Sequence, residues 1–335
     1  MNKLTKIGVS ALCGSLASVA AANAGSLDVT GGATATYTSL DGEVTGNPLG
    51  MASGMTFTGN GELDNGSTFK LSIAHTNKST YTASAISITT PTLGTFTYDE
   101  GGGTGLDRID DMIPTAWEEV DGTAVAMGLR TAAGAGGSAD IEWNVGSSLG
   151  LPDGMATYIS YTPQADGSKN SNKASSGASA TTDGYGMDVV VTHSGIYDGL
   201  NVFGGVSKIN QNSTLGDRKE WTAGATYALA GVTVGYQKTR INSPGAADAY
   251  YENDAYGASF AINDDLTISY AKTESDKVTA SSTVSRTLEG SSLQLSYSFG
   301  GASIKIAESE VDNKNYLTTA ANQREGRTVA LTLAF

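Results

Sequence analysis

Several residue types are scarce in this chain, and each scarcity excludes a class of protein. The only cysteine is Cys13, so the chain beyond it has neither disulfides nor cysteine metal sites. The 20 basic residues are outnumbered by 34 acidic ones, and the formal net charge of −14 excludes a nucleic-acid partner, which needs a basic face. After the first residues, no apolar run reaches the length of a membrane helix, so a helical membrane protein is excluded too.

The amino-terminal residues are typical of a secretory signal. Lys3 and Lys6 form a short positive region, 7–20 is apolar or small, and Ala22-Asn23-Ala24 is a cleavage sequence of the A-x-A kind. We therefore expect residues 1–24 to be removed and 25–335 to form one mature domain. Processing removes two lysines and no acid, so the mature chain is still more acidic.

The abundant feature of this chain is the alternation of apolar residues with small or polar residues. In the last nine residues, Val329, Leu331, Leu333 and Phe335 fall on one face of an extended strand, and threonine and alanine fall on the other. The same period recurs along the mature chain, which predicts about sixteen strands. The expected strands lie around residues 27–37, 55–59, 69–73, 84–88, 93–98, 141–145, 155–161, 187–191, 200–206, 221–227, 232–236, 256–262, 266–270, 293–299, 304–306 and 329–335.

The connections between these strands alternate in length. Short turns such as Asn65-Gly66 and Ala230-Gly231 alternate with longer polar stretches, for example near Ser171 and Pro244. The strands of a soluble β-sandwich also alternate apolar and polar residues. In this chain, however, the less apolar face of the strands is almost all threonine, serine, glycine and alanine. Aromatic residues lie near strand ends, as an interfacial girdle requires: Tyr98, Tyr161, Tyr236, Tyr270, Phe299 and Phe335. We therefore predict an all-β, 16-stranded antiparallel transmembrane β-barrel with a wet interior.

Taken together, the signal, the alternating strands, the L-G-T-F-T-Y strand at Leu93–Tyr98 before a long connection, and the terminal Phe335 resemble a Gram-negative general porin of the type common in alphaproteobacteria. The resemblance covers the whole chain. It implies an outer-membrane location, a long third loop that folds into the barrel, and a homotrimer. It also implies that the outer-membrane assembly machinery reads Val329, Leu331, Leu333 and Phe335.

The long connection, Asp99 to Ser138, is the strongest functional candidate. A connection of this length inside a compact fold is usually functional. The spacing of Leu106, Ile109, Met112 and Ile113 predicts a short amphipathic helix that Pro114 ends. Its first half holds one base, Arg108, among eight acids: Asp99, Glu100, Asp107, Asp110, Asp111, Glu118, Glu119 and Asp121. We predict that these residues form an acidic pore constriction that enriches cations. An ordinary solvated outer loop is the alternative.

A few other residues are candidates for a functional role outside the long connection. By strand parity Lys70 and Lys305 point into the lumen, and Arg130 is a third candidate for an opposing basic wall. Lys208, Lys238 and Lys272 have outward parity near outer strand ends, where lysine meets lipid head groups. Asp107, Asp110 and Asp111 are weak Ca²⁺ candidates, because the EF-hand spacing is absent. No P-loop or catalytic triad is present in the sequence, so we expect neither a cofactor nor an enzyme.

The sequence thus predicts a porin for passive diffusion of small hydrophilic solutes and ions, with a weak cation preference. Its expected partners are outer-membrane lipid and, as the resemblance implies, two further copies of the chain in a homotrimer. The alternatives are a substrate-specific channel with a saturable site, or a non-conducting adhesin or binding barrel. Current through a lipid bilayer separates them, because a plugged barrel is silent and a specific channel is blocked by its solute.

Overall fold

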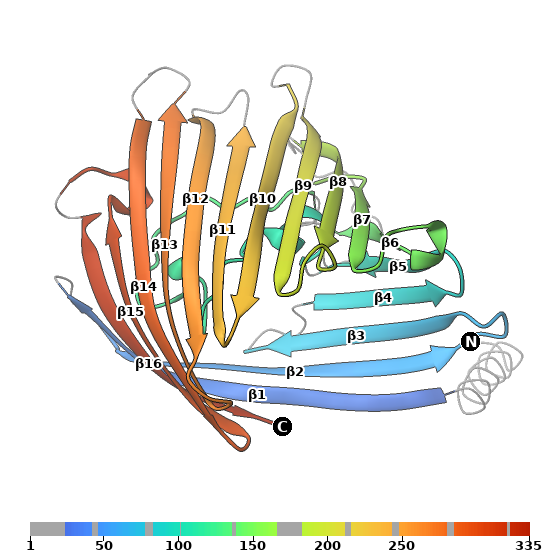
Figure 1. The fold of residues 1–335 in the computed structure, drawn as a ribbon, viewed down its shortest axis with the longest axis horizontal. Coiled ribbons are helices and arrows are strands. Elements are labelled where there is room, and N and C mark those ends of the chain that lie inside the picture. Colours follow the sequence, from blue (N-terminus) through green and yellow to red (C-terminus); the bar gives the residue numbers. More distant parts are fainter. Residues whose placement is uncertain are drawn as a thin grey trace, which may run out of the picture.

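The computed structural model is built almost wholly from β-strands (Figure 1). It describes residues 24–41, 46–77, 83–100, 102–135, 139–165, 183–211, 216–242, 248–279, 285–319 and 322–335. The expected signal, residues 1–24, lies outside these ranges apart from Ala24. Within them, no helix is long and apolar enough to cross a membrane.

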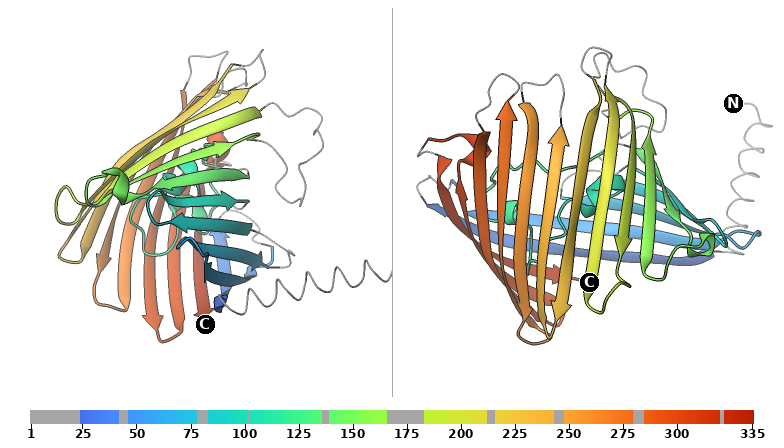
Figure 2. Two further views of the ribbon diagram at one scale, coloured as in Figure 1. Left: turned by 90° about the vertical axis from the view of Figure 1, so that its right-hand side faces the viewer. Right: turned by 45° about the horizontal axis from the view of Figure 1, so that its top comes forward.

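Sixteen antiparallel strands close into one barrel, as predicted. Each strand pairs with its neighbour in sequence, and β16 pairs with β1 to complete the ring (Figures 1 and 2). The strands are β1 (Ala24–Asp41), β2 (Leu49–Glu62), β3 (Thr68–Thr76), β4 (Ala83–Thr90), β5 (Gly94–Asp99), β6 (Asp140–Val145), β7 (Met155–Thr162), β8 (Asp183–His193), β9 (Leu200–Gln211), β10 (Arg218–Leu229), β11 (Val232–Asn242), β12 (Asp248–Ala261), β13 (Leu266–Thr279), β14 (Ser285–Phe299), β15 (Ala302–Asp312) and β16 (Arg324–Ala334).

The alternation of exposed apolar side chains with polar ones distinguishes the two faces of the barrel wall. In β11, Val234 and Tyr236 lie exposed on one face, whereas Gln237 and Thr239 are buried on the other. A lipid-facing shell has this character, because the outward side chains of a transmembrane barrel are apolar and face the hydrocarbon of the bilayer. We call the face with the exposed apolar residues outward and the other face lumenal. The six expected girdle aromatics, from Tyr98 to Phe335, are all exposed.

Tight turns join the strands at one end of the barrel. Ala230 and Gly231 both have positive φ, +51° and +83°, and connect the directly paired Leu229 and Val232. This is the twist that a two-residue hairpin requires, and the glycine meets it without steric cost. The expected turn at Asn65-Gly66 is present too, and Leu63 N–H donates to Ser67 C=O at 2.7 Å.

The hydrophobic core lies where the connection between β5 and β6, residues 100–139, meets the wall. Buried residues of this β5–β6 connection include Leu106, Ile109 and Met127. They form one cluster with buried residues of the strands, among them Val190 of β8 and Leu288 of β14. The position of the β5–β6 connection is therefore fixed by apolar packing as well as by the hydrogen bonds described next.

Candidate functional site

The β5–β6 connection contains two short 3₁₀ helices, η1 (Gly105–Ile109) and η2 (Val120–Gly122). The predicted amphipathic helix is therefore wrong beyond Ile109, since Met112 and Ile113 lie outside η1. The wall supplies the reason: the Gln237 side chain of β11 donates to the carbonyls of Ile109 and Asp110 at 2.9 and 2.7 Å, and accepts from Met112 N–H at 2.8 Å. These backbone groups would otherwise continue the helix.

Buried carboxylates on the lumenal face hold both ends of the connection. Asp188 of β8 is fully buried and accepts the N–H groups of Leu106 and Ala135, at 2.9 and 3.0 Å. Glu220 of β10 accepts Gly134 N–H at 2.8 Å. Asp188 thus bonds one residue near the start of the connection and one near its end. Sequence reasoning missed both residues, although an acid at a lumenal strand position was the available signal.

The middle of the connection bonds to strands farther round the barrel. Gln294 of β14 accepts Trp117 N–H at 2.9 Å and donates to Glu118 C=O at 2.7 Å. Ser269 of β13 accepts Ala116 N–H at 2.8 Å. Because these strand residues are lumenal, residues 106–118 of the β5–β6 connection lie along the lumenal face from β8 to β14.

The one base in the first half of the connection is neutralised by the wall. Arg108 pairs with Glu142 of β6, a residue buried on the lumenal face. The guanidinium also lies over the Tyr158 ring, 4.1 Å from its centroid. Glu142 further accepts Gly105 N–H at 2.8 Å, so this ion pair also fastens the backbone. Arg108 therefore adds little net positive charge to its surroundings.

Three of the predicted acids come together. Asp110, Asp111 and Glu119 line a cavity of about 60 Å³ between the connection and the wall of β11–β13. Burial, followed by the charge of Asp111, raises the pKa of Asp110 to about 8. A hydrogen bond with the Asp111 carboxyl, followed by burial, raises the pKa of Glu119 to about 7. Glu118 is exposed beside them. We call these four residues the acidic group.

Asp121 lines the same cavity but has a structural role. Its carboxylate accepts the N–H of Met127, and hydrogen bonds from Gly128 and Leu129 also favour its charged form. Burial nevertheless raises its pKa above the ordinary value. Asp121 therefore closes a turn within the connection, whereas the prediction treated it as one of the pore carboxylates.

Three other predicted acids lie near the start of the connection. Asp99, the last residue of β5, accepts Gly102 N–H at 2.9 Å, and Asp107 accepts Gly103 N–H at 2.7 Å. Glu100 accepts from the hydroxyls of Ser84 and Tyr98, at 3.1 and 2.9 Å. Both hydroxyls belong to outward positions, since Tyr98 is exposed and Ser84 shares its face with exposed Ile86. Glu100 therefore lies against the outward side of the wall, whereas the prediction placed it in the pore constriction.

The three predicted bases lie apart from one another. Lys305 of β15 is lumenal, with Nζ 5.9 Å from the ring centroid of Trp117. Lys70 of β3 is exposed on the lumenal face, opposite the outward Leu71. Arg130 belongs to the β5–β6 connection itself, where Asn253 donates to its carbonyl at 2.6 Å, so it is not part of an opposing strand wall.

Among the residues that the structure describes, no group of three or more histidine, cysteine, aspartate or glutamate residues could hold a metal ion. The weak Ca²⁺ candidates Asp107, Asp110 and Asp111 are thus not arranged as a ligand set. His75 and His193 lie on different strands, β3 and β8.

The chain end lies at the closure of the barrel. Leu331 and Leu333 are exposed on the outward face, and Val329 shares that face at a less exposed position. Phe335 is 77% exposed, and its backbone exchanges hydrogen bonds of 2.9 and 3.1 Å with Gly31 of β1. The alternation predicted for these four residues is present, with the aromatic ring pointing away from the barrel interior.

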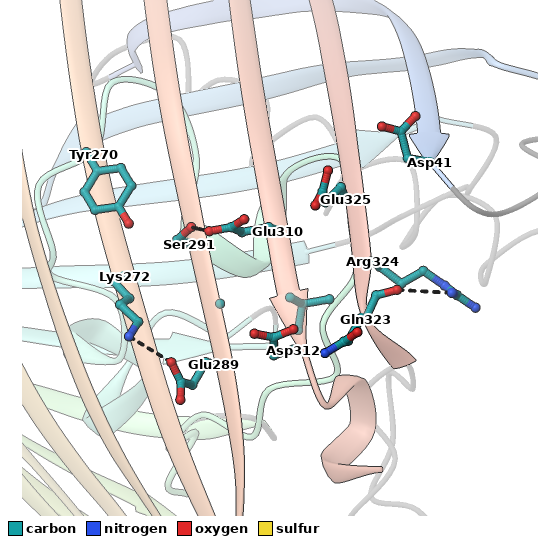
Figure 3. Close-up of a pocket in the computed structure, with 12 residues that line it drawn as sticks. Asp41, Tyr270, Lys272, Glu289, Ser291, Glu310, Asp312, Gln323, Arg324 and Glu325 are labelled. Carbon is teal, nitrogen blue, oxygen red and sulfur yellow. Dashed lines mark hydrogen bonds and ion pairs between the residues drawn. The ribbon is translucent and has the colours of Figure 1, made fainter. Parts of the chain in front are cut away.

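A second set of acids lies on the outward face, near the ends of β13–β16 and β1. Figure 3 shows these side chains around a groove of about 640 Å³. Glu289, Glu310, Asp312, Glu325 and Asp41 line it, and Lys272 pairs with Glu289 at 2.9 Å. Lys238 forms similar pairs with Glu252 and Asp254, and Lys208 with Asp217. The outward parity expected for the three lysines is therefore present, and each has a carboxylate partner.

Solved structures share this fold. OmpF of Salmonella typhi, in a complex with daunomycin, matches with a TM-score of 0.71 at 13% identity over 92% of this chain and 97% of that one. The anion-selective porin from Comamonas acidovorans matches with a TM-score of 0.70 at 15% identity, over 92% and 99%. A loop L8 deletion mutant of the Vibrio cholerae outer membrane protein OmpT gives 0.67 at 11%, over 92% and 99%. At such identities the likeness shows the fold alone.

Among curated proteins, none gives a significant sequence match. A family model, however, covers almost the whole chain. The model of the Gram-negative porins matches residues 8–334, and the chain therefore belongs to this family of outer-membrane channels for passive diffusion.

Proposed function

We propose that the β5–β6 connection narrows the channel and that its acidic group gives the pore a weak preference for cations. One observation carries this proposal: exposed carboxylates of Asp111, Glu118 and Glu119 stand on a segment whose backbone is bonded to the lumenal face. Carboxylates between low-dielectric walls focus a negative potential and raise the local concentration of cations.

The preference is weak for two reasons. Because their pKa values are raised to about 8 and about 7, Asp110 and Glu119 carry only part of their negative charge at neutral pH. Lys305, Lys70 and Arg130 also bring positive charge to the lumen. They stand at separate places in the wall and the connection, so they do not form the dense basic cluster that a strong transverse field requires.

Reversal potentials in a salt gradient across a planar bilayer test the proposal. Neutralising the acidic group (Asp110→Asn, Asp111→Asn, Glu118→Gln, Glu119→Gln) should lower cation preference. The matched control neutralises four outward acids of the groove in Figure 3: Glu289→Gln, Glu310→Gln, Asp312→Asn and Glu325→Gln. If both variants change selectivity equally, or neither does, the acidic group is not at the narrowest point.

The same recordings separate the other classes of function. An open pore passes current in proportion to voltage, with no saturable block by a solute. A silent barrel would favour an adhesin, and block by one solute would favour a substrate-specific channel. We propose passage by diffusion alone, without a catalytic step or a cofactor.

We also propose that the protein is a cleaved, exported homotrimer. The outward faces of β1 and β2 carry some of the most exposed apolar side chains of the barrel, Leu27 at 71% and Met51 at 76%, which a neighbouring subunit would cover. Amino-terminal sequencing of the exported protein should begin at Gly25. Chemical cross-linking in native membranes should give a species of three chains. Recognition of Val329, Leu331, Leu333 and Phe335 by the assembly machinery predicts that Phe335 deletion lowers the yield of folded barrel.

A further inference from the structure

The short segment after β15 buries one aromatic side chain, which a surface connection normally does not do. Residues 313–316 include the 3₁₀ helix η4 (Lys314–Tyr316), and we call these four residues the latch. Tyr316 is only 4% exposed, although it belongs to a connection between two strands. A connection whose aromatic side chain is buried inside the barrel is held there by specific contacts.

One side chain of the latch joins two strands to the β5–β6 connection. The Tyr316 hydroxyl shares a hydrogen bond of 2.7 Å with Ser275 of β13 and accepts Arg130 N–H at 3.3 Å. The Tyr316 ring meets the Tyr251 ring of β12 edge-on, with centroids 5.3 Å apart. Lys277 Nζ lies 5.7 Å from the centroid of the Tyr316 ring.

The polar groups around Tyr316 form a closed circuit. Ser275 Oγ donates to Asn253 Oδ1 at 2.5 Å, so the proton between Ser275 and Tyr316 must come from Tyr316. Asn253 Nδ2 in turn donates to Arg130 C=O at 2.6 Å. The circuit therefore begins and ends on the backbone of Arg130, and each hydroxyl in it has a defined direction of donation.

A second contact lies next to this circuit. Asn315 N–H donates to Met127 C=O at 2.9 Å. Gly128, with φ of +76°, packs so closely that a Cβ there would lie 2.0 Å from Asn315 Oδ1. The latch thus contacts residues 127–130 in two ways. The side-chain circuit reaches Arg130, whereas a backbone hydrogen bond to Met127 and the Asn315 side chain against Gly128 hold the other end.

The backbone of the latch is strained. Asn313, Asn315 and Tyr316 all have positive φ, between 55° and 60°. Asparagine tolerates this region, but a bulky residue such as tyrosine rarely adopts it. Strain of this kind persists only where the surrounding contacts over-determine the conformation, and it concentrates at functional sites.

We propose that the latch fixes residues 127–130 of the β5–β6 connection, with Tyr316 as its positioning residue, so that two connections together set the bore. This proposal rests on the proposed constriction by the β5–β6 connection. It concerns the steadiness of the bore and not its charge. Its failure is therefore visible separately: the latch changes current noise, whereas the acidic group changes reversal potential.

Tyr316→Phe tests the proposal, because it removes the hydroxyl and keeps the ring. Tyr270→Phe is the matched control, since Tyr270 lies on β13 but faces outward and is half exposed. The first readout is single-channel conductance and open-channel noise of the full chain in a planar bilayer. The second is the rate at which a cysteine at exposed Ala126 (Ala126→Cys, in a Cys13→Ser background) reacts with a charged thiol reagent.

Loss of one hydrogen bond should increase local opening about fivefold, and the reaction rate at position 126 should rise accordingly. We also expect noisier current with an unchanged reversal potential. Gly128→Ala pushes on the latch from the other side and should give the same change. Noise and reactivity in Tyr316→Phe that equal those of Tyr270→Phe would overturn the proposal, provided that the β-sheet circular dichroism spectrum is intact.

Discussion

The lumenal wall has two halves that differ in burial: we call β6–β16 the covered half and β1–β5 the uncovered half. In the part of the chain that the structure describes, every buried strand residue belongs to β6–β16, and none belongs to β1–β5. The lumenal positions of β6–β16 include long hydrogen-bonding side chains, such as Asp188, Gln237 and Gln294. Those of β1 and β2 are mainly threonine and glycine, for example Thr36 and Gly54.

This difference shows that polar residues inside a barrel are of two kinds. Threonines of β1–β5 line the open side, and their short hydroxyls bond within the wall, as between Ser87 and Thr97 at 2.9 Å. Carboxylates and amides of β6–β14 reach past the wall to backbone groups of the β5–β6 connection. Side-chain length and the number of hydrogen-bonding atoms therefore mark the path of that connection, although strand period alone does not distinguish the two kinds.

The largest effect should come from removing the carboxylate that holds both ends of the connection. Asp188→Ala leaves the buried N–H groups of Leu106 and Ala135 without their acceptor, at a cost of about 1–3 kcal/mol for each donor. Thr36→Ala in the uncovered half should cost about 0.5 kcal/mol or less. Urea unfolding in lipid vesicles measures both. Similar losses for the two variants would show that the two halves do not differ energetically.

A smaller effect is expected from replacing one lumenal glycine with alanine in each half of the wall. A Cβ at lumenal Gly235 would lie 2.5 Å from Pro114 Cδ of the connection, whereas one at Gly54 would lie 3.4 Å from its nearest neighbour. Gly235→Ala must displace the connection, and overpacking of this kind costs about 1–3 kcal/mol. Gly54→Ala should be close to neutral. Unfolding free energy and single-channel conductance should therefore both change in the first variant and stay constant in the second.

How much of this could be predicted from sequence depends on the range of the interaction. The strands were predictable because period two is a local property, which a chain segment such as Val232–Tyr236 displays by itself. The lumenal parity of Lys70 and Lys305 followed from the same rule. The position of the long connection, between the fifth and sixth strands, followed from counting them.

The details of the site were not predictable, because they depend on partners far away in sequence. The expected helix stops at Ile109 since Gln237, more than a hundred residues later, takes its backbone groups. Asp121 closes a turn with Met127, and Glu100 follows the outward face of the wall. An acid in the sequence has the same signature whether it faces a pore, caps a turn or anchors a backbone.

The cation preference of the channel should depend on pH through the acidic group, which lies against the covered half of the wall. Glu119 and Asp110 have pKa values raised to about 7 and about 8, so both are largely protonated and neutral below this range. Raising the pH from about 6 to about 9 ionises Glu119 first and Asp110 next, and cation preference should rise accordingly. Reversal potentials at several pH values test this. The variant with the neutralised acidic group should show little dependence, and a falling preference in the unaltered protein would contradict the assignment.

The smallest effect is expected from replacing one lumenal lysine in each half of the wall. This comparison separates the contribution of charge to selectivity from the contribution of packing to stability. Lys305 lies near the Trp117 ring, a contact worth about 0.5–1 kcal/mol, whereas Lys70 stands exposed on the uncovered side. Lys305→Met and Lys70→Met each remove one positive charge from the lumen, so both should slightly increase cation preference in reversal-potential measurements. Only Lys305→Met should also lower the unfolding free energy, because only Lys305 contacts the β5–β6 connection. If Lys70→Met destabilised the barrel equally, the contact with Trp117 would not explain the loss in Lys305→Met, and the energetic contrast between these two lumenal lysines would fail.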